Sequence, residues 1–258
     1  YGAGIYDLVI DSTIRIEANK MTSGNTASTT GSMGNTREML IGGLAAWIAG
    51  PANISNVTSK ATIRLESTSA TFQRIGTVGG IIGSNWSGAA GIYNCVSSAT
   101  IQYKGGATNP GLESNVRLGG IIGSVNDVNS KCTINNCAVT GANITAYNGG
   151  VCMGGVIGYT HSNTQTIKIS NTVVNATLST PSAAGNYTTP DVGAIIGWAD
   201  GGLNTTNGSK ISDIYITGGS PTNQLYSANS GNLTSEMANL FSNINTSAAS
   251  SATIVPSV

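Results

Sequence analysis

Short apolar stretches bounded by glycine recur along the chain, and a second apolar pattern follows each of them. The first pattern appears as GGLAA at 42–46, GGIIG at 79–83, GGIIG at 119–123, GGVIG at 154–158 and GAIIG at 193–197. The second pattern starts at Ile54, Ile92, Ile134, Ile169 and Ile211, and a partial copy occupies residues 5–16. The glycine copies begin 37, 40, 35 and 39 residues apart. Spacing of this length predicts a repeat architecture, in which each copy stacks on its neighbours.

The segments inside each repeat have the pattern of short β-strands. TIRL at 62–65 and TIQY at 100–103 alternate polar and apolar residues, which is typical of a half-buried strand. Stretches rich in Gly, Ser, Asn and Thr, such as 23–36, separate the strands and predict loops. The sequence therefore predicts an all-β protein, a parallel β-helix (solenoid) of about 5–6 coils, which we expect to be right-handed.

Stacked coils place equivalent residues in columns about 4.8 Å apart. One predicted core column is Ile5, Ile54, Ile92, Ile134, Ile169 and Ile211. A polar column, expected to form an amide ladder, is Asn56, Asn94, Asn136 and Asn171, with Asp7 and Asp213 at its two ends. The column after it is Leu8, Val57, Cys95, Cys137, Thr172 and Ile214. A further column is Ile14, Ile63, Ile101, Ile144 and Leu178.

We expect one domain over residues 1–258, with a partial coil at 5–16 and coils starting at 42, 79, 119, 154 and 193. The region 218–258 is predicted to hold a C-terminal cap and a return strand. LTSEMANLF at 233–241 has apolar residues at helical spacing, so we expect a short helix that covers the end of the solenoid. SSATI at 250–254 repeats residues 97–101, and 251–255 is expected to pair beside 211–216.

Composition narrows the classes of partner. Charged residues make up 9% of the chain and the net charge is zero, which argues against nucleic acid and against an electrostatic membrane anchor. No apolar run is long enough for a transmembrane helix. The chain opens at Tyr1 with no signal peptide and no initiator Met, so we expect a mature or trimmed piece of a longer product.

The blocks GGIIGSN…IYNCVSSATI and GGIIGSV…INNCAVTGANI resemble the GLUG-type repeat, and the resemblance covers roughly residues 42–216 with a partial copy at 5–16. The first copy departs from that pattern because GGLAA lacks the closing glycine, and the fifth has Asp213 in place of Asn. Such repeats are known from large bacterial surface and secreted proteins, many of them adhesin-like. The resemblance implies a β-helical segment of a cell-surface protein and carries no catalytic residue with it.

Catalytic and metal chemistry receive little support from the sequence. Glycoside chemistry needs paired carboxylates, but the acids lie in different loops or at the ends, and none is expected to share a column of adjacent coils. His161 is the only histidine and is interpreted as an exposed loop residue. No catalytic residue, cofactor or metal ligand is therefore assigned. The segments 126–130 and 199–209 carry oxygen ligands and leave calcium open, although ordinary turns use the same residues.

Aromatic and cysteine residues supply the candidate sites. Trp47, Tyr159 and Trp198 follow the glycine segment and Trp86 lies two positions further along, so Tyr159 and Trp198 are expected side by side. They form either a strip that stacks on sugar rings or a packed coil corner. Cys95 and Cys137 are expected to be stacked, reduced thiols. A disulfide between Cys132 and Cys152 is left open.

The function that we expect from these observations is a non-catalytic structural and recognition module of a bacterial cell-surface or secreted adhesin. It would be extracellular and bind a host or bacterial surface glycan or protein through its loops, those after Ser84, Ser124, Tyr159 and Trp198 above all. A carbohydrate-binding or carbohydrate-active β-helix is the first alternative. A purely structural spacer is the second, and long loops such as 17–41 argue mildly against it. Oligomeric state and ligand identity are not determined by the sequence.

Overall fold

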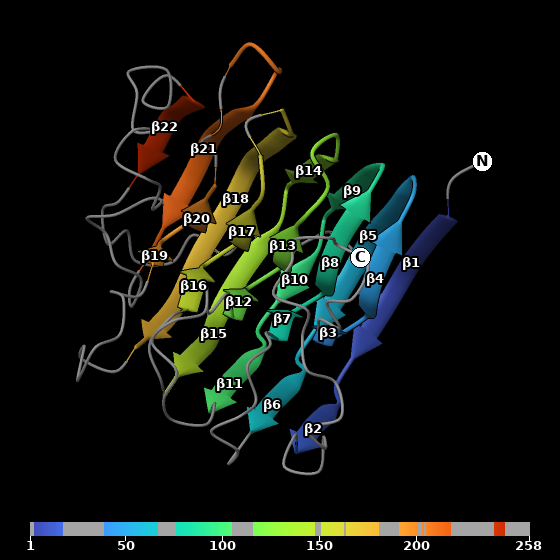
Figure 1. Ribbon diagram of the computed structural model, residues 1–258, viewed down its shortest axis with the longest axis vertical. Helices are drawn as coiled ribbons and strands as arrows, with labels where there is room; N and C mark the ends of the chain where they lie inside the picture. Colours follow the sequence, from blue (N-terminus) through green and yellow to red (C-terminus); the bar gives the residue numbers. More distant parts are fainter. Residues whose placement is uncertain are drawn as a thin grey trace, which may run out of the picture.

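A β-solenoid makes up nearly all of the described structure. The computed structural model describes residues 3–17, 39–66, 76–104, 116–147, 151–162, 164–180, 191–200, 203, 205–217 and 240–245. The strands in these ranges pair in parallel and form three sheets, here called sheets A, B and C. Figure 1 shows the strands of each sheet following one another from the blue N-terminal end to the red C-terminal end.

Sheet A is the largest and contains twelve strands. They are β1 (Ala3–Ile10), β2 (Thr13–Glu17), β5 (Ala52–Ser59), β6 (Thr62–Glu66), β9 (Ala89–Tyr93), β10 (Val96–Ser97), β11 (Thr100–Lys104), β14 (Lys131–Asn135), β15 (Ala138–Ala146), β18 (Thr166–Ser179), β21 (Lys210–Ile216) and β22 (Phe241–Asn245).

Sheets B and C contain five strands each, one from every predicted copy of the glycine segment. Sheet B consists of β3 (Met39–Gly42), β7 (Gly76–Gly79), β12 (Val116–Gly119), β16 (Val151–Gly154) and β19 (Asp191–Gly193). Sheet C consists of β4 (Ala45–Ala49), β8 (Ile82–Ser87), β13 (Ile122–Val125), β17 (Ile157–Thr160) and β20 (Ile196–Ala199). Each coil therefore runs through sheet B, then sheet C, then sheet A.

The predicted columns are confirmed by the strand register. Ile92 is in register with both Ile54 and Ile134, and Ile169 is in register with Ile211. The column that contains Ile63 and Ile144 is in register from Ile14 to Leu178. These side chains are buried within the stack and more exposed at its ends: Ile5 is 37% exposed, and Ile14 and Leu178 are partly buried.

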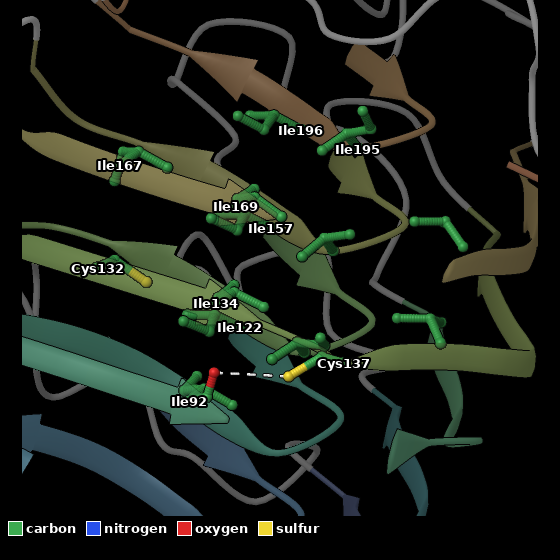
Figure 2. Packing of buried hydrophobic residues seen from close by; sticks show 14 of the residues in the cluster. Ile92, Ile122, Cys132, Ile134, Cys137, Ile157, Ile167, Ile169, Ile195 and Ile196 are labelled. Atoms are coloured by element: carbon green, nitrogen blue, oxygen red, sulfur yellow. Dashed lines mark hydrogen bonds between the residues drawn. The ribbon is translucent and has the colours of Figure 1, made fainter. Parts of the chain in front are cut away.

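The glycine pair of each copy, which is Gly193–Ala194 in the fifth, divides the core into two compartments. The chain reverses sharply between sheets B and C at these glycines, and the tip of the reversal touches the middle of sheet A, where the Ser59 hydroxyl donates to the Gly80 carbonyl at 2.6 Å. One compartment lies between sheet C and the first half of sheet A, where isoleucines such as Ile134 and Ile122 meet (Figure 2). The other lies between sheet B and the second half of sheet A and includes Leu118 and Ile144.

The asparagine column marks a corner of the coil and contains every left-handed non-glycine residue in the described ranges. Amides bridge neighbouring coils: Asn136 Nδ2 donates to Asn94 Oδ1 at 2.8 Å, and Asn56 Nδ2 donates to Asp7 Oδ1 at 2.8 Å. Each member has φ between 48° and 58°: Asp7, Asn56, Asn94, Asn136, Asn171, Asp213 and Asn243. Asn and Asp tolerate this conformation better than other residues with a Cβ. The column therefore has two roles: its side chains bond neighbouring coils together, and its residue types permit the left-handed backbone of the corner.

The C-terminal end differs from the prediction. Phe241 was placed in a helix but begins β22, and it is in register with Ile211. The segment FSNIN at 241–245 is a further copy of the second pattern, because Asn243 Nδ2 donates to Asp213 Oδ1 at 2.9 Å and extends the ladder beyond its predicted end. Leu240, the residue before β22, is helical and fully buried in the core, whereas residues 233–239 of the predicted helix and the return strand at 251–255 lie outside the described residues.

Substitution of Asn136 separates the two roles of this column. We expect Asn136→Ala to lower the free energy of unfolding by about 2 kcal/mol, because alanine loses both the left-handed preference and the bond to Asn94. Asn136→Gly keeps the backbone freedom and should cost only about 1 kcal/mol. Urea unfolding measures both values. A glycine variant that is no more stable than the alanine variant would contradict the conformational role.

Candidate functional site

Sheets B and C pack against each other with an offset of one coil. Glycines of sheet C lie directly on the backbone of sheet B: a Cβ on Gly158 of β17 would stand 2.7 Å from the Leu118 amide nitrogen of β12. Gly83, Gly123 and Gly197 meet β3, β7 and β16 in the same way. Each strand of sheet C after β4 therefore rests on the sheet B strand of the preceding coil, and side chains from different repeats meet between the two sheets.

The offset brings Arg117 of β12 onto Tyr159 of β17. The Arg117 guanidinium carbon lies 3.8 Å from the centre of the Tyr159 ring, which is the geometry of a cation–π contact. Arg117 also donates from Nη1 to Asn126 Oδ1 at 2.6 Å. The ring of Tyr159 is thus covered on one face by a cation, and only 5% of the residue is exposed.

The Tyr159 hydroxyl joins two loops. It donates to Asp200 Oδ2 at 2.9 Å and lies 3.1 Å from His161 Nδ1. Burial raises the pKa of Tyr159, Arg117 partly offsets that rise, and Asp200 adds to it. The phenol therefore stays protonated at neutral pH and acts as a hydrogen-bond donor, so it does not suit the role of a base or nucleophile.

His161 and Asp200 stand at the open side of this cluster. Their side chains are each 40% exposed and His161 Nδ1 lies 4.0 Å from Asp200 Oδ2, so they form an ion pair when the imidazole is protonated. His161 lies in a loop as predicted, but it is held: its backbone amide donates to Gln165 Oε1 at 3.1 Å. Gln165 in turn donates from Nε2 to the Val125 carbonyl at 2.9 Å, which ties this loop to the one before it.

All four cysteines are free, buried thiols. Cys132 lies in β14 of sheet A and Cys152 in β16 of sheet B, so the pairing that the sequence left open is not formed in the structure. Burial raises the pKa of each of these two thiols to about 12. Cys95 and Cys137 are stacked as predicted, and the Cys137 thiol lies 3.5 Å from the Cys95 amide.

The predicted aromatic residues separate into two groups. Tyr159 and Trp198 are in register on neighbouring strands, as predicted, but burial of Tyr159 under Arg117 removes it from any exposed strip. Smaller residues fill this column in the second and third coils, where Ser84 Oγ lies 3.0 Å from Ser124 Oγ. The strip therefore does not continue along the solenoid.

Trp47 and Trp86 form the second group, at the N-terminal end of sheet C. Trp47 is 54% exposed, and its ring meets that of Trp86 edge to face, with centroids 6.3 Å apart and an interplanar angle of 80°. A pocket of about 220 Å³ lies beside Trp47 and is bounded by Ile5 and by residues 49–54. The one-coil offset explains the exposure of Trp47, because no described strand of sheet B precedes β3 to cover β4.

The carboxylates were expected not to share columns of adjacent coils, but among the described residues one pair does share a column. Glu17 and Glu66 are in register on β2 and β6, although Arg15 Nη2 donates to Glu66 Oε2 at 3.3 Å and balances that charge. In segment 126–130, the Asp127 carbonyl accepts bonds from Ser130 and Gln165, which is ordinary turn geometry. Within the described ranges, no group of three His, Cys, Asp or Glu side chains is arranged to hold a metal ion.

Arg117 is the residue that sequence reasoning missed. Its position in VRLGG precedes the glycine pair by two residues, in the same place as Cys152 of the next repeat, and no motif distinguishes it. Its contact with Tyr159 depends on the offset between sheets B and C, which no pattern in a single chain reveals.

Comparison of the chain with protein-family models, with curated proteins and with solved structures gives no match. Among the described residues, no helix is long and apolar enough to cross a membrane.

Proposed function

We propose that this chain is a non-catalytic recognition module of a bacterial cell-surface or secreted adhesin. The observation that carries the proposal is the separation of a regular scaffold from one variable edge. The joins from sheet A to sheet B leave the ends of β6, β11, β15 and β18, and these ends lie next to one another in register. Between those ends and the next strand of sheet B, the chain has 9, 11, 4 and 11 residues.

The opposite edge is tied more closely to the scaffold. Its joins, from sheet C to sheet A, have 2, 1, 5, 5 and 10 residues, and Gln165 links those of the third and fourth coils through its bonds to the Val125 and Asp127 carbonyls. Segments of variable length and sequence on a rigid scaffold are where binding residues concentrate. The cluster of Tyr159, His161 and Asp200 suits a structural role better than a catalytic one, because the Tyr159 hydroxyl donates its hydrogen bond to the Asp200 carboxylate.

A binding array tests this function. The purified domain should bind at least one surface glycan or host-matrix protein, and replacing 67–75 or 105–115 with a Gly/Ser segment of equal length should weaken that binding while the cooperative unfolding transition remains. Absence of binding to every member of the array would contradict the proposal. Release of oligosaccharide from a bound polysaccharide would instead favour the carbohydrate-active alternative.

A further inference from the structure

A departure from the repeat occurs where β4 pairs with β8. Ile48 is in register with Asn85 and Ala49 with Ser87, so Trp86 is an extra residue with no partner in β4. A β-bulge of this kind turns the side chain of the extra residue away from the regular pleat, and bulges are enriched beside functional sites. Here the bulge sets Trp86 against Trp47 from the preceding coil.

Two glycines fix the corner beside this pair. Gly50 and Gly88 follow β4 and β8 and have φ of 130° and 97°, a conformation that residues with a Cβ rarely adopt. They also touch, since a Cβ on Gly88 would lie 2.7 Å from the Gly50 backbone. In the third and fourth coils this corner holds longer segments, at 126–130 and at the described residues 161–162 and 164–165, so only this end of the described solenoid keeps a tight glycine corner next to two tryptophans.

The pocket beside Trp47 has the chemistry for a small uncharged ligand. None of the described residues that line the pocket is charged. The lining combines apolar side chains, those of Trp47, Ile48 and Ile54, with the Gly50–Pro51 corner. Its volume of about 220 Å³ falls below the roughly 300–1,000 Å³ typical of pockets for drug-sized ligands and suits a single ring. An indole next to backbone polar groups provides an apolar surface for C–H groups and hydrogen-bond partners for hydroxyls.

From this arrangement we infer that the pocket beside Trp47 binds one uncharged pyranose ring of a glycan, with the ring lying on the Trp47 indole and with Trp86, outside the pocket lining, holding that indole edge to face. The site goes beyond the proposed function: it rests on the recognition role but adds a glycan-binding position separate from the loops of the variable edge. It replaces Tyr159 as the aromatic platform, since Tyr159 is covered by Arg117. It also lies at a sheet C to sheet A corner, away from the variable edge.

Tryptophan fluorescence provides the direct measurement, because the chain has only three tryptophans. In a Trp198→Phe variant the signal comes from Trp47 and Trp86 alone. Titration with neutral cello-, manno- and xylo-oligosaccharides should change this emission for at least one series, whereas acidic oligogalacturonate should have no effect. Trp47→Ala should weaken binding of that series at least tenfold, and Trp47→Phe should retain part of it.

The matched control is Trp198→Ala, a partly buried tryptophan in the same column at the other end of sheet C. It should leave oligosaccharide binding unchanged. Trp47→Ala should keep the melting temperature of the parent, because its side chain is largely exposed. Unchanged oligosaccharide binding by a folded Trp47→Ala variant would overturn the inference. Binding of the domain to proteins on the array, but to none of the neutral sugars, would overturn it while leaving the recognition function intact.

Discussion

Gly158→Ala should remove the cooperative unfolding transition or lower the free energy of unfolding by at least about 4 kcal/mol. The added Cβ would lie 2.5 Å from the Gly123 carbonyl oxygen and 2.7 Å from the Leu118 amide nitrogen. Both neighbours are backbone atoms: Leu118 belongs to sheet B, and Gly123 belongs to β13, which pairs with β17 in sheet C, so relief requires sheets B and C to separate and the pairing of β13 with β17 to shift. Urea unfolding followed by circular dichroism measures the effect.

Gly141→Ala is the matched control for this substitution. Gly141 has φ of 66° and a Cβ there would meet no atom within 4 Å, so the variant should cost only the conformational term of about 1–2 kcal/mol. The two variants thus separate steric exclusion from backbone strain. A Gly158→Ala protein as stable as Gly141→Ala would show that sheets B and C are not held in backbone contact.

The second large effect is a loss of stability at alkaline pH. Unfolded thiols ionise above their ordinary pKa of 9.0, whereas burial holds the pKa of Cys132 and Cys152 at about 12. Between these values the folded chain binds more protons than the unfolded chain, so stability falls as pH rises. At pH 10 the loss amounts to about 1.4 kcal/mol for each thiol, or about 3 kcal/mol for the two. The raised pKa of Tyr159 acts in the same direction at higher pH.

Urea unfolding at pH 7.5 and pH 10 tests this linkage. The double variant Cys132→Ala with Cys152→Ala is expected to start from a lower stability, because it loses two buried sulfur atoms, yet to lose about 3 kcal/mol less than the parent between the two pH values. Either single variant should recover about half of that difference. An identical pH dependence in parent and double variant would mean that these thiols titrate normally in the folded chain.

Much of the scaffold follows from local sequence. The isoleucine and asparagine columns were predicted because each repeat carries the same residue types at the same spacing, and a one-residue slip would expose the whole apolar set. The Phe241 copy was missed because LTSEMANLF also fits helical spacing, and only pairing with Ile211 distinguishes the two. The prediction relied on the helical spacing of the apolar residues, whereas in the structure Phe241 pairs with the free edge of β21 in sheet A.

The candidate sites were less accessible to sequence reasoning. That Tyr159 and Trp198 are neighbours follows from the repeat, but the exposure of each aromatic residue depends on contacts between sheets that are far apart in the sequence. Arg117 covers Tyr159 only because the two sheets are offset. The bulge at Trp86 reflects one additional residue in a single repeat, which the glycine spacing does not reveal.

The one-coil offset between sheets B and C also bears on how such a chain can evolve. Arg117 and Tyr159 belong to different repeats, yet they must be compatible in size and charge. A duplication one repeat long copies one strand of sheet B and one strand of sheet C. Because a sheet C strand contacts the sheet B strand of the preceding coil, each copied strand meets a new partner, and the matched pair is not inherited. Preserving it requires a segment that spans β12 through β17, longer than one repeat. A matched pair therefore constrains two adjacent repeats together, and the smaller residues Thr77, Ser84 and Ser124, which occupy equivalent positions in other coils, are fully buried.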